Sequence, residues 1–202
     1  PKNVKGNSSL DATHPDATIR YHASNMVLWV HSDASYLSEP GARSRAGGHY
    51  FLSATPANPP AAPHADAPPP PNNGAVHNRS SLMKVVMSSA TEAETGAAFF
   101  NAKDAVPIRI CLDKMGHPQP PTPLQVDNRC AAGIANRTVK QRRSKAIDMR
   151  FYWLRDRACQ DQFRIFWRKG IDNPADYFTI HPSPLHHQRM RPSYLQVNSA
   201  SG

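Results

Sequence analysis

One segment, residues 26–33 (MVLWVHSD), constrains the fold of this chain more than any other part of its sequence. It is rich in β-forming residues and apolar on both faces, which is typical of a strand that is covered on both sides. Residues 46–54 (AGGHYFLSA) follow after a turn-like sequence at 38–41. Together these segments predict a β-hairpin that begins in the central strand of a sheet.

The order of the later segments predicts the fold class. Ser89 and Glu92 have the spacing of a capping box, which predicts the start of a helix that continues towards Gly116 with a bend near Pro107. The other elements expected after the hairpin are strands at 82–87, 124–127 and 163–167 and helices at 146–160 and 173–178. Three consecutive strands followed by alternating helices and strands indicate an α/β protein with a mixed five-stranded sheet flanked by helices.

The length of 202 residues suits one domain with irregular ends. We expect a linker from an upstream domain at 1–22, the domain itself at 23–180, and a basic C-terminal tail at 181–202. Residues 55–73 are rich in proline and lack apolar periodicity, which predicts a disordered surface insertion in the domain. The chain begins without a leader and is interpreted as a piece of a longer protein. It contains no run near the about 20 apolar residues that would cross a bilayer, so no membrane is expected as a partner.

The composition favours one class of partner and excludes some kinds of site. Lys and Arg number 24 against 15 Asp and Glu, giving a formal net charge of +9 at pH 7, and nucleic acid is the commonest polyanionic partner of such a chain. Cys111, Cys130 and Cys159 are far apart and form no CxxC motif, which excludes a zinc ribbon and a disulfide framework. We expect all three thiols to be buried, as small hydrophobic residues in a reducing compartment.

Four acidic residues stand where predicted elements begin or end: Asp33, Glu94, Asp127 and Asp176. If the first and fourth strands are neighbours in the sheet, these four carboxylates can meet at one edge. Hard divalent cations such as Mg²⁺ prefer carboxylate oxygens, and a pair of such ions about 4 Å apart supports in-line phosphoryl displacement. The alternative is that each acid is an ordinary solvated or helix-capping residue.

Six strings in the same order resemble the ribonuclease H domain that ends the polyprotein of copia-type LTR retrotransposons. They lie at 31–36 (HSDASY), 42–48 (ARSRAGG), 88–94 (SSATEAE), 126–128 (VDN), 144–153 (SKAIDMRFYW) and 173–179 (NPADYFT). The resemblance implies a ribonuclease H-like fold, binding of two Mg²⁺ ions that Mn²⁺ could replace, and hydrolysis of the RNA strand of RNA–DNA hybrids during reverse transcription. It also implies that Asp33, Glu94, Asp127 and Asp176 are the catalytic, metal-binding carboxylates.

The same resemblance predicts the surroundings in which the chain works. Its expected partners are an RNA–DNA hybrid and the upstream reverse transcriptase domain of the same polyprotein, and in isolation it is expected to be a monomer. The expected location is intracellular, in a cytoplasmic retroelement particle or the nucleus.

The chain departs from its relatives in ways that leave alternatives open. It has Lys-Ala-Ile-Asp at 145–148 where many relatives have Lys-His-Ile-Asp, and no histidine at 168–175, where cellular ribonucleases H often carry one. A decayed domain that serves as a basic structural or nucleic-acid-binding module is therefore an alternative. A DNA-cutting nuclease of the same fold is a third, although its last acid would be a glutamate rather than Asp176. His186 and His187 are assigned to the tail.

Five residues are candidates for substrate contact. Ser89 and Asn128 adjoin the acidic residues and could contact the 2′-hydroxyl that distinguishes RNA from DNA. Arg142, Arg143 and Lys145 belong to a basic tract that could bind phosphates of the hybrid. The alternatives are that Ser89 caps a helix, that Asn128 forms a turn, and that the tract is a solvated loop or a nuclear-import signal.

Overall fold

The computed structural model describes residues 17–54, 73–135, 148–170, 173–180 and 182–197. Most of the proline-rich insertion and all of the basic tract with Arg142, Arg143 and Lys145 lie outside these ranges, so the predictions about them stay predictions. Within the described ranges, no helix has the length and apolar character that crossing a membrane requires.

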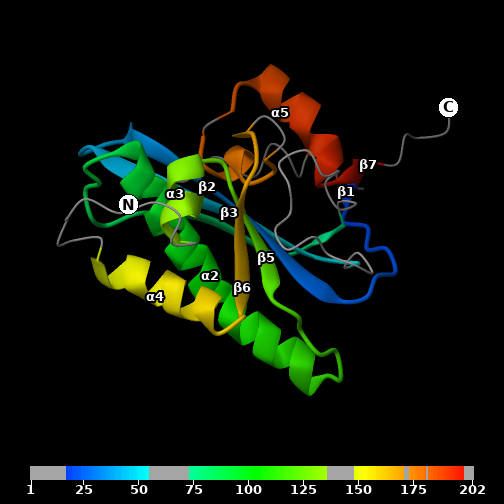
Figure 1. Cartoon of the computed structure of the whole chain (residues 1–202). Coiled ribbons are helices and arrows are strands. Elements are labelled where there is room, and N and C mark those ends of the chain that lie inside the picture. The colour runs from blue at the N-terminus through cyan, green and yellow to red at the C-terminus, as the bar shows by residue number, and fades with distance from the viewer. Residues whose placement is uncertain (1–16, 55–72, 136–147, 171–172, 181, 198–202) are drawn as a thin grey trace, which may run out of the picture.

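A five-stranded mixed sheet forms the centre of the molecule, with the order β4-β3-β2-β5-β6 (Figure 1). The central strand β2 (Val27–Glu39) pairs antiparallel with β3 (Arg43–Ser53) and parallel with β5 (Thr122–Val126). The edges are β4 (Ala75–Leu82) and β6 (Phe163–Trp167). The predicted α/β class, the five-stranded mixed sheet and the adjacency of the first and fourth predicted strands are confirmed.

Three helices lie over one face of this sheet, which we call the helix face. They are α2 (Ala90–Lys114), α3 (Arg129–Ala135) and α4 (Asp148–Cys159), and α2 and α4 pack side by side (Figure 1). Ala98, Ala102 and Ala105 recur at helical spacing and are buried, so α2 approaches the sheet closely. The strand residues beneath them are Leu28, Val30, Tyr50, Leu124 and Val126.

The C-terminal part of the chain covers the opposite face, which we call the C-terminal face. It contains η2 (Asp176–Phe178), α5 (Pro184–Met190), η3 (Arg191–Ser193) and β7 (Gln196–Val197). The ring of Tyr194 stacks on Tyr177 and contacts His49 of β3 edge to face. At the far end, β7 pairs antiparallel with β1 (Ala17–Thr18). The structure therefore contains ordered elements in the regions predicted as linker and tail, while the division into domains stays a prediction.

The strand predicted at 82–87 is wrong. The third strand of the hairpin region is β4, which ends at Leu82, and the apolar residues that follow it form a connection. Met83 and Met87 of this connection are buried against Gly96 in the first turns of α2, where an added Cβ would lie 3.1 Å from the Met87 Cε. The apolar pattern thus marked burial under a helix, whereas the edge strand itself is mainly polar and is held by backbone pairing.

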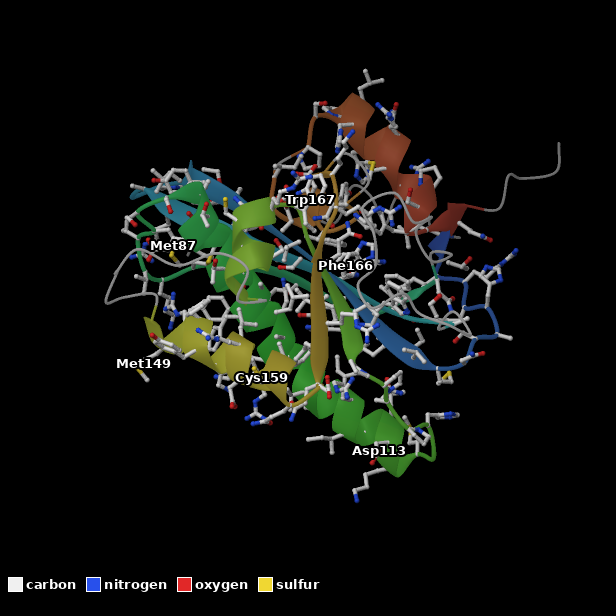
Figure 2. The ribbon with its side chains drawn as sticks, in the orientation of Figure 1. Met87, Asp113, Met149, Cys159, Phe166 and Trp167 are labelled. Atoms are coloured by element: carbon white, nitrogen blue, oxygen red, sulfur yellow. The ribbon has the colours of Figure 1, made fainter. Side chains whose placement is uncertain are left out.

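The prediction that the cysteines are buried is also wrong. Cys111, Cys130 and Cys159 are exposed, and no disulfide joins them in the described part of the chain. They lie at exposed positions of α2, α3 and α4, and Figure 2 shows Cys159 at the C-terminal end of α4. Their helical neighbours Leu112 and Ala131 occupy the inward positions instead. The position of a residue on its helix therefore decided its burial, rather than the hydrophobicity of the thiol.

Candidate active site

Three carboxylates meet at one end of the sheet. Asp33 lies on β2, Glu94 on α2 and Asp127 directly after β5, and one oxygen atom of each lies within 4.8 Å of the others. The register of the parallel strands explains how the two aspartates come together. Val30 is opposite Leu124, and Asp33 and Asp127 each follow three residues later.

The start of α2 brings Glu94 to the two aspartates. Ser89 is the N-cap residue, and its hydroxyl accepts a hydrogen bond of 3.1 Å from the backbone N–H of Glu92. This start places Glu94 in the second turn, where its Oε1 accepts a hydrogen bond of 3.1 Å from the backbone N–H of Ala34. The other oxygen, Oε2, is buried and has no hydrogen-bond partner among the described residues. Glu94 thus has a fixed orientation and one free oxygen.

Burial and mutual repulsion make the cluster electrostatically unfavourable without a counter-charge. Burial raises the pKa of Asp33 to about 7, and the charges of Asp127 and Asp176 add to it against a hydrogen bond from Thr179. Burial, together with the charges of Asp33 and Asp127, also raises the pKa of Glu94 well above its ordinary value. A hard divalent cation would remove both costs, so the buried oxygen set fits such an ion.

Asp176 lies near this group but outside its closest set. It begins η2, and it is absent from the three carboxylates that lie within 4.8 Å of one another in the described part of the chain. Burial raises the pKa of Asp176, the charge of His186 opposes this, and Asp127 adds to it. The structure thus brings three of the four predicted acids together and places the fourth within electrostatic reach.

The two histidines assigned to the tail belong to the folded region. His186 and His187 lie on α5, and the His187 Nδ1 is hydrogen-bonded to the hydroxyl of Tyr177. His186 is close enough to Asp176 to influence its pKa. A helix after the last acid therefore brings a histidine towards the site, although residues 168–175 contain none.

Ser89 makes the capping contact that the alternative interpretation predicted, and Asn128, for which a turn was predicted, makes a similar contact at the start of α3. Ser89 caps α2, and the Glu92 carboxylate accepts from the backbone N–H of Ser88 at 2.7 Å rather than from Ser89, which corrects the predicted capping box. The Asn128 Oδ1 accepts a hydrogen bond of 3.1 Å from the backbone N–H of Ala131 at the start of α3. Contact of Ser89 or Asn128 with the substrate stays a prediction.

Sequence reasoning did not assign roles to Thr179, Asn173 and Gly47. The Thr179 hydroxyl donates to the Asp33 Oδ2 at 2.6 Å, and the Asn173 side chain donates to the Ser32 carbonyl at 2.9 Å. Gly47 is the cross-strand partner of Asp33 and leaves room for this segment. All three belong to the strings that carry the family resemblance. The sequence therefore marked these positions, but it did not indicate which contacts their side chains make.

This sheet order, with an acidic cluster at one end, is the ribonuclease H fold. Among solved structures, the chain is similar to LC11-RNase H1, isolated from compost by a metagenomic approach. The TM-score is 0.53 at 10% identity, covering 76% of this chain and 93% of that one. A crystal structure of LC11-RNase H1 in complex with an RNA/DNA hybrid gives a TM-score of 0.51 at 12% identity, covering 75% and 93%. At this identity the similarity establishes the fold.

A curated relative connects the chain to mobile elements. Over 105 residues it is 29% identical to the retrovirus-related Pol polyprotein from transposon TNT 1-94 of Nicotiana tabacum. The match covers 52% of this chain and 8% of that polyprotein, so the chain corresponds to a small part of its relative. No family model matches the sequence. The resemblance to a ribonuclease H domain of a retrotransposon polyprotein is confirmed by these comparisons.

Proposed function

We propose that this chain is a metal-dependent ribonuclease H that hydrolyses the RNA strand of RNA–DNA hybrids. The observation that carries the proposal is the convergence of Asp33, Glu94 and Asp127 at one end of the sheet. Buried carboxylates that repel one another are costly for folding, and they are expected where a cation is to be bound. Similarity in fold to LC11-RNase H1, which has been crystallised with an RNA/DNA hybrid, supports the choice of substrate.

In this proposal Asp33, Glu94, Asp127 and Asp176 hold two Mg²⁺ ions, which Mn²⁺ can replace. When bound, such ions supply an activated water and stabilise the leaving oxygen. The protein contributes rigid ligands: the backbone N–H of Ala34 orients Glu94, and the paired strands fix the spacing between the two aspartates. Burial of Asp33 and Glu94 keeps bulk water away from their carboxylates.

The wider setting belongs to the same proposal. The chain acts on a hybrid delivered by the upstream reverse transcriptase domain of its polyprotein, as a monomer, within an intracellular retroelement particle. Arg142, Arg143 and Lys145 contact phosphates, while Ser89 and Asn128 lie beside the scissile strand. The net charge of +9 supports a polyanionic substrate.

One experiment tests the catalytic proposal with a matched control inside a single helix. Hybrid cleavage is measured with 5′-labelled RNA, in Mg²⁺ and in EDTA, for wild type, Glu94→Gln and Glu92→Gln. We expect Glu94→Gln to lose at least about 1000-fold in rate, because the loss of a metal ligand removes several kcal/mol of transition-state stabilisation. Glu92→Gln should keep its activity, because Glu92 is two residues from Glu94 and so lies on another side of α2, where it accepts a hydrogen bond from the backbone of Ser88.

The alternative proposal, a decayed domain that only binds nucleic acid, predicts a different result. A wild-type protein that binds the hybrid in a salt-dependent manner but does not cleave it at any Mg²⁺ or Mn²⁺ concentration would establish that alternative. Equal losses in Glu94→Gln and Glu92→Gln would refute the assignment of Glu94.

A further inference from the structure

Asp33 accepts a hydrogen bond from a side chain that is far from it in the sequence, near the C-terminal end of the predicted domain. The hydroxyl of Thr179 lies 2.6 Å from the Asp33 Oδ2 and 2.9 Å from the backbone carbonyl oxygen of Asp176. A hydroxyl has one proton, and a hydrogen bond to a carboxylate is stronger than one to a neutral carbonyl. The shorter contact therefore receives the proton, and Thr179 donates to Asp33.

Hydrogen bonds fix the segment that carries Thr179 to two strands of the sheet. The Asn173 side chain donates to the Ser32 carbonyl of β2 at 2.9 Å, and the Ser80 hydroxyl of β4 donates to the carbonyl of Phe178 at 2.8 Å. The backbone N–H of Thr179 donates to the carbonyl of Asp176 at 3.0 Å, which closes η2. Thr179 itself is 1% exposed, so its hydroxyl has little freedom to choose another partner.

The sheet is shaped to let this segment approach. Gly47 of β3 is paired with Asp33, and an added Cβ there would lie 2.5 Å from the Thr179 Cγ2 and 2.6 Å from the carbonyl oxygen of Ala175. Any larger residue would push the segment off the sheet and move the hydroxyl away from Asp33. Gly47 and Thr179 are therefore parts of one arrangement.

We propose that Thr179 is the positioning residue of Asp33: its hydroxyl holds Oδ2 and leaves Oδ1 directed towards the cation shared with Glu94 and Asp127. This inference rests on the proposed function and deepens it. Thr179 touches neither the substrate nor the cation, so its loss should weaken cation binding and turnover and leave binding of the hybrid unchanged. Partners that orient metal ligands typically change metal affinity or activity by about 10- to 100-fold.

The test compares Thr179→Val, which keeps the shape and removes the donor, with Thr179→Ser, which keeps the donor. Thr122→Val is the matched control, because Thr122 is equally buried on β5 but lies five residues before Asp127 and accepts a hydrogen bond from Arg109. For each protein, Mn²⁺ affinity is measured by calorimetry without nucleic acid, and kcat and KM are measured on the hybrid. Thermal unfolding establishes that each variant is folded.

We expect Thr179→Val to lose about 10-fold in Mn²⁺ affinity and in kcat, with KM for the hybrid within about twofold of wild type. The Mn²⁺ affinity and kcat of Thr179→Ser should lie within about threefold of the wild-type values. Thr122→Val should match wild type in both quantities while it lowers the melting temperature. A folded Thr179→Val with wild-type Mn²⁺ affinity and kcat would overturn the proposal, and so would a Thr179→Ser that fails to restore them.

If Thr179→Val does not fold, Thr179→Ala removes the same donor without a buried branched side chain. If both variants are unfolded while Thr179→Ser is folded, the residue serves folding alone and the proposal is overturned. Wild-type protein that binds Mn²⁺ without cleaving would refute the proposed function, and the affinity comparison would still decide the role of Thr179. Wild-type protein that does not bind Mn²⁺ would overturn both.

Discussion

Polar side chains buried against the middle of the central sheet have hydrogen-bond partners on the helix face, whereas two of those on the C-terminal face have none among the described residues. On the helix face, Tyr50 donates to the Asn101 Oδ1 at 2.8 Å, and the Asn101 side-chain nitrogen donates to the Ser32 hydroxyl at 2.8 Å and to the Gly47 carbonyl at 2.7 Å. On the C-terminal face, both ring nitrogens of His31 and both polar atoms of Gln125 are buried and have no hydrogen-bond partner among the described residues.

This difference indicates that one face mainly contributes stability and the other mainly contributes activity. The helix face combines a packed apolar core with a satisfied polar pair, which is the pattern that contributes stability. The C-terminal face holds Asp33, Asp127 and the orphaned polar atoms of His31 and Gln125, each of which costs free energy of folding. Substitutions on the helix face should therefore mainly change stability, and substitutions near the carboxylates should mainly change activity.

The largest effect is expected on cleavage activity, from substitution of a carboxylate in the group formed by Asp33, Glu94 and Asp127. Asp127→Asn should lower hybrid cleavage by at least about 1000-fold without loss of stability, because the amide keeps the shape but removes a charge that binds the cation. Asp113→Asn is the control, since Asp113 is an exposed acid at the far end of α2, remote from Trp167 at the site end of β6 (Figure 2). Single-turnover cleavage and thermal unfolding check both parts, and residual activity above a hundredth of wild type would contradict the prediction.

The second effect is a pH dependence of stability in metal-free protein. The pKa of Asp33 is raised to about 7 in the folded state, so between about pH 4 and pH 7 the folded protein binds more protons than the unfolded chain. The contribution of Asp33 to stability is then largest below pH 4 and is lost as pH rises from 4 through 7, by up to about 4 kcal/mol.

In urea unfolding with EDTA, the unfolding free energy of Asp33→Asn should therefore increase relative to that of wild type as pH rises from 4 to 8. Saturating Mg²⁺ should remove the decrease in the unfolding free energy of wild type. A difference between the two proteins that does not change with pH would show that burial and repulsion do not act on Asp33 as described.

The third prediction concerns the helix face. Leu28→Ala should cost about 3 kcal/mol of unfolding free energy, because Leu28 is fully buried under α2 and its truncation leaves a cavity. The kcat of the protein that remains folded should change by less than about twofold. Denaturant unfolding and kinetics at low temperature measure the two quantities, and a large loss of kcat in folded protein would break the proposed division between the faces.

At pH 7 the smallest effect is expected from a change that removes orphaned polar atoms. His31→Phe should raise the unfolding free energy by about 1 kcal/mol at pH 7, because two buried nitrogens without partners are replaced by an apolar ring beside Phe51. Burial, and then the charges of His49 and Arg168, lower the pKa of His31 to about 3.

Below pH 6.5 the unfolded histidine binds a proton that the folded one does not, so wild type loses stability as pH falls towards 3. The advantage of His31→Phe should therefore grow by about 1.4 kcal/mol for each pH unit between 6.5 and about 3. The control is His22→Phe, which makes the same replacement at an exposed position and should lack the gain of about 1 kcal/mol at pH 7. An advantage that shrinks on acidification would contradict this account.

Much of the fold could be predicted because it depends on local pattern. The two-sided apolar run around Val30 predicted the central strand, and the Ser89 cap predicted the start of α2 to within one residue. The prediction failed at β4, because an edge strand needs backbone pairing and little apolar pattern. It failed again at the three cysteines, because residue type alone does not say which side of a helix faces the sheet.

The sequence by itself determined which residue types could do the chemistry. The positions of the acids beside predicted elements, and the strings that resemble retrotransposon ribonucleases H, predicted Asp33, Glu94, Asp127 and Asp176 as candidates before any contact was known. Only the tertiary structure decided that the first three are mutually close, that Asp176 stands slightly apart, and that Thr179 reaches back 146 residues to Asp33. Such contacts depend on strand register and on how closely two backbones approach at Gly47, which are properties of the packed sheet and have no local signature in the chain.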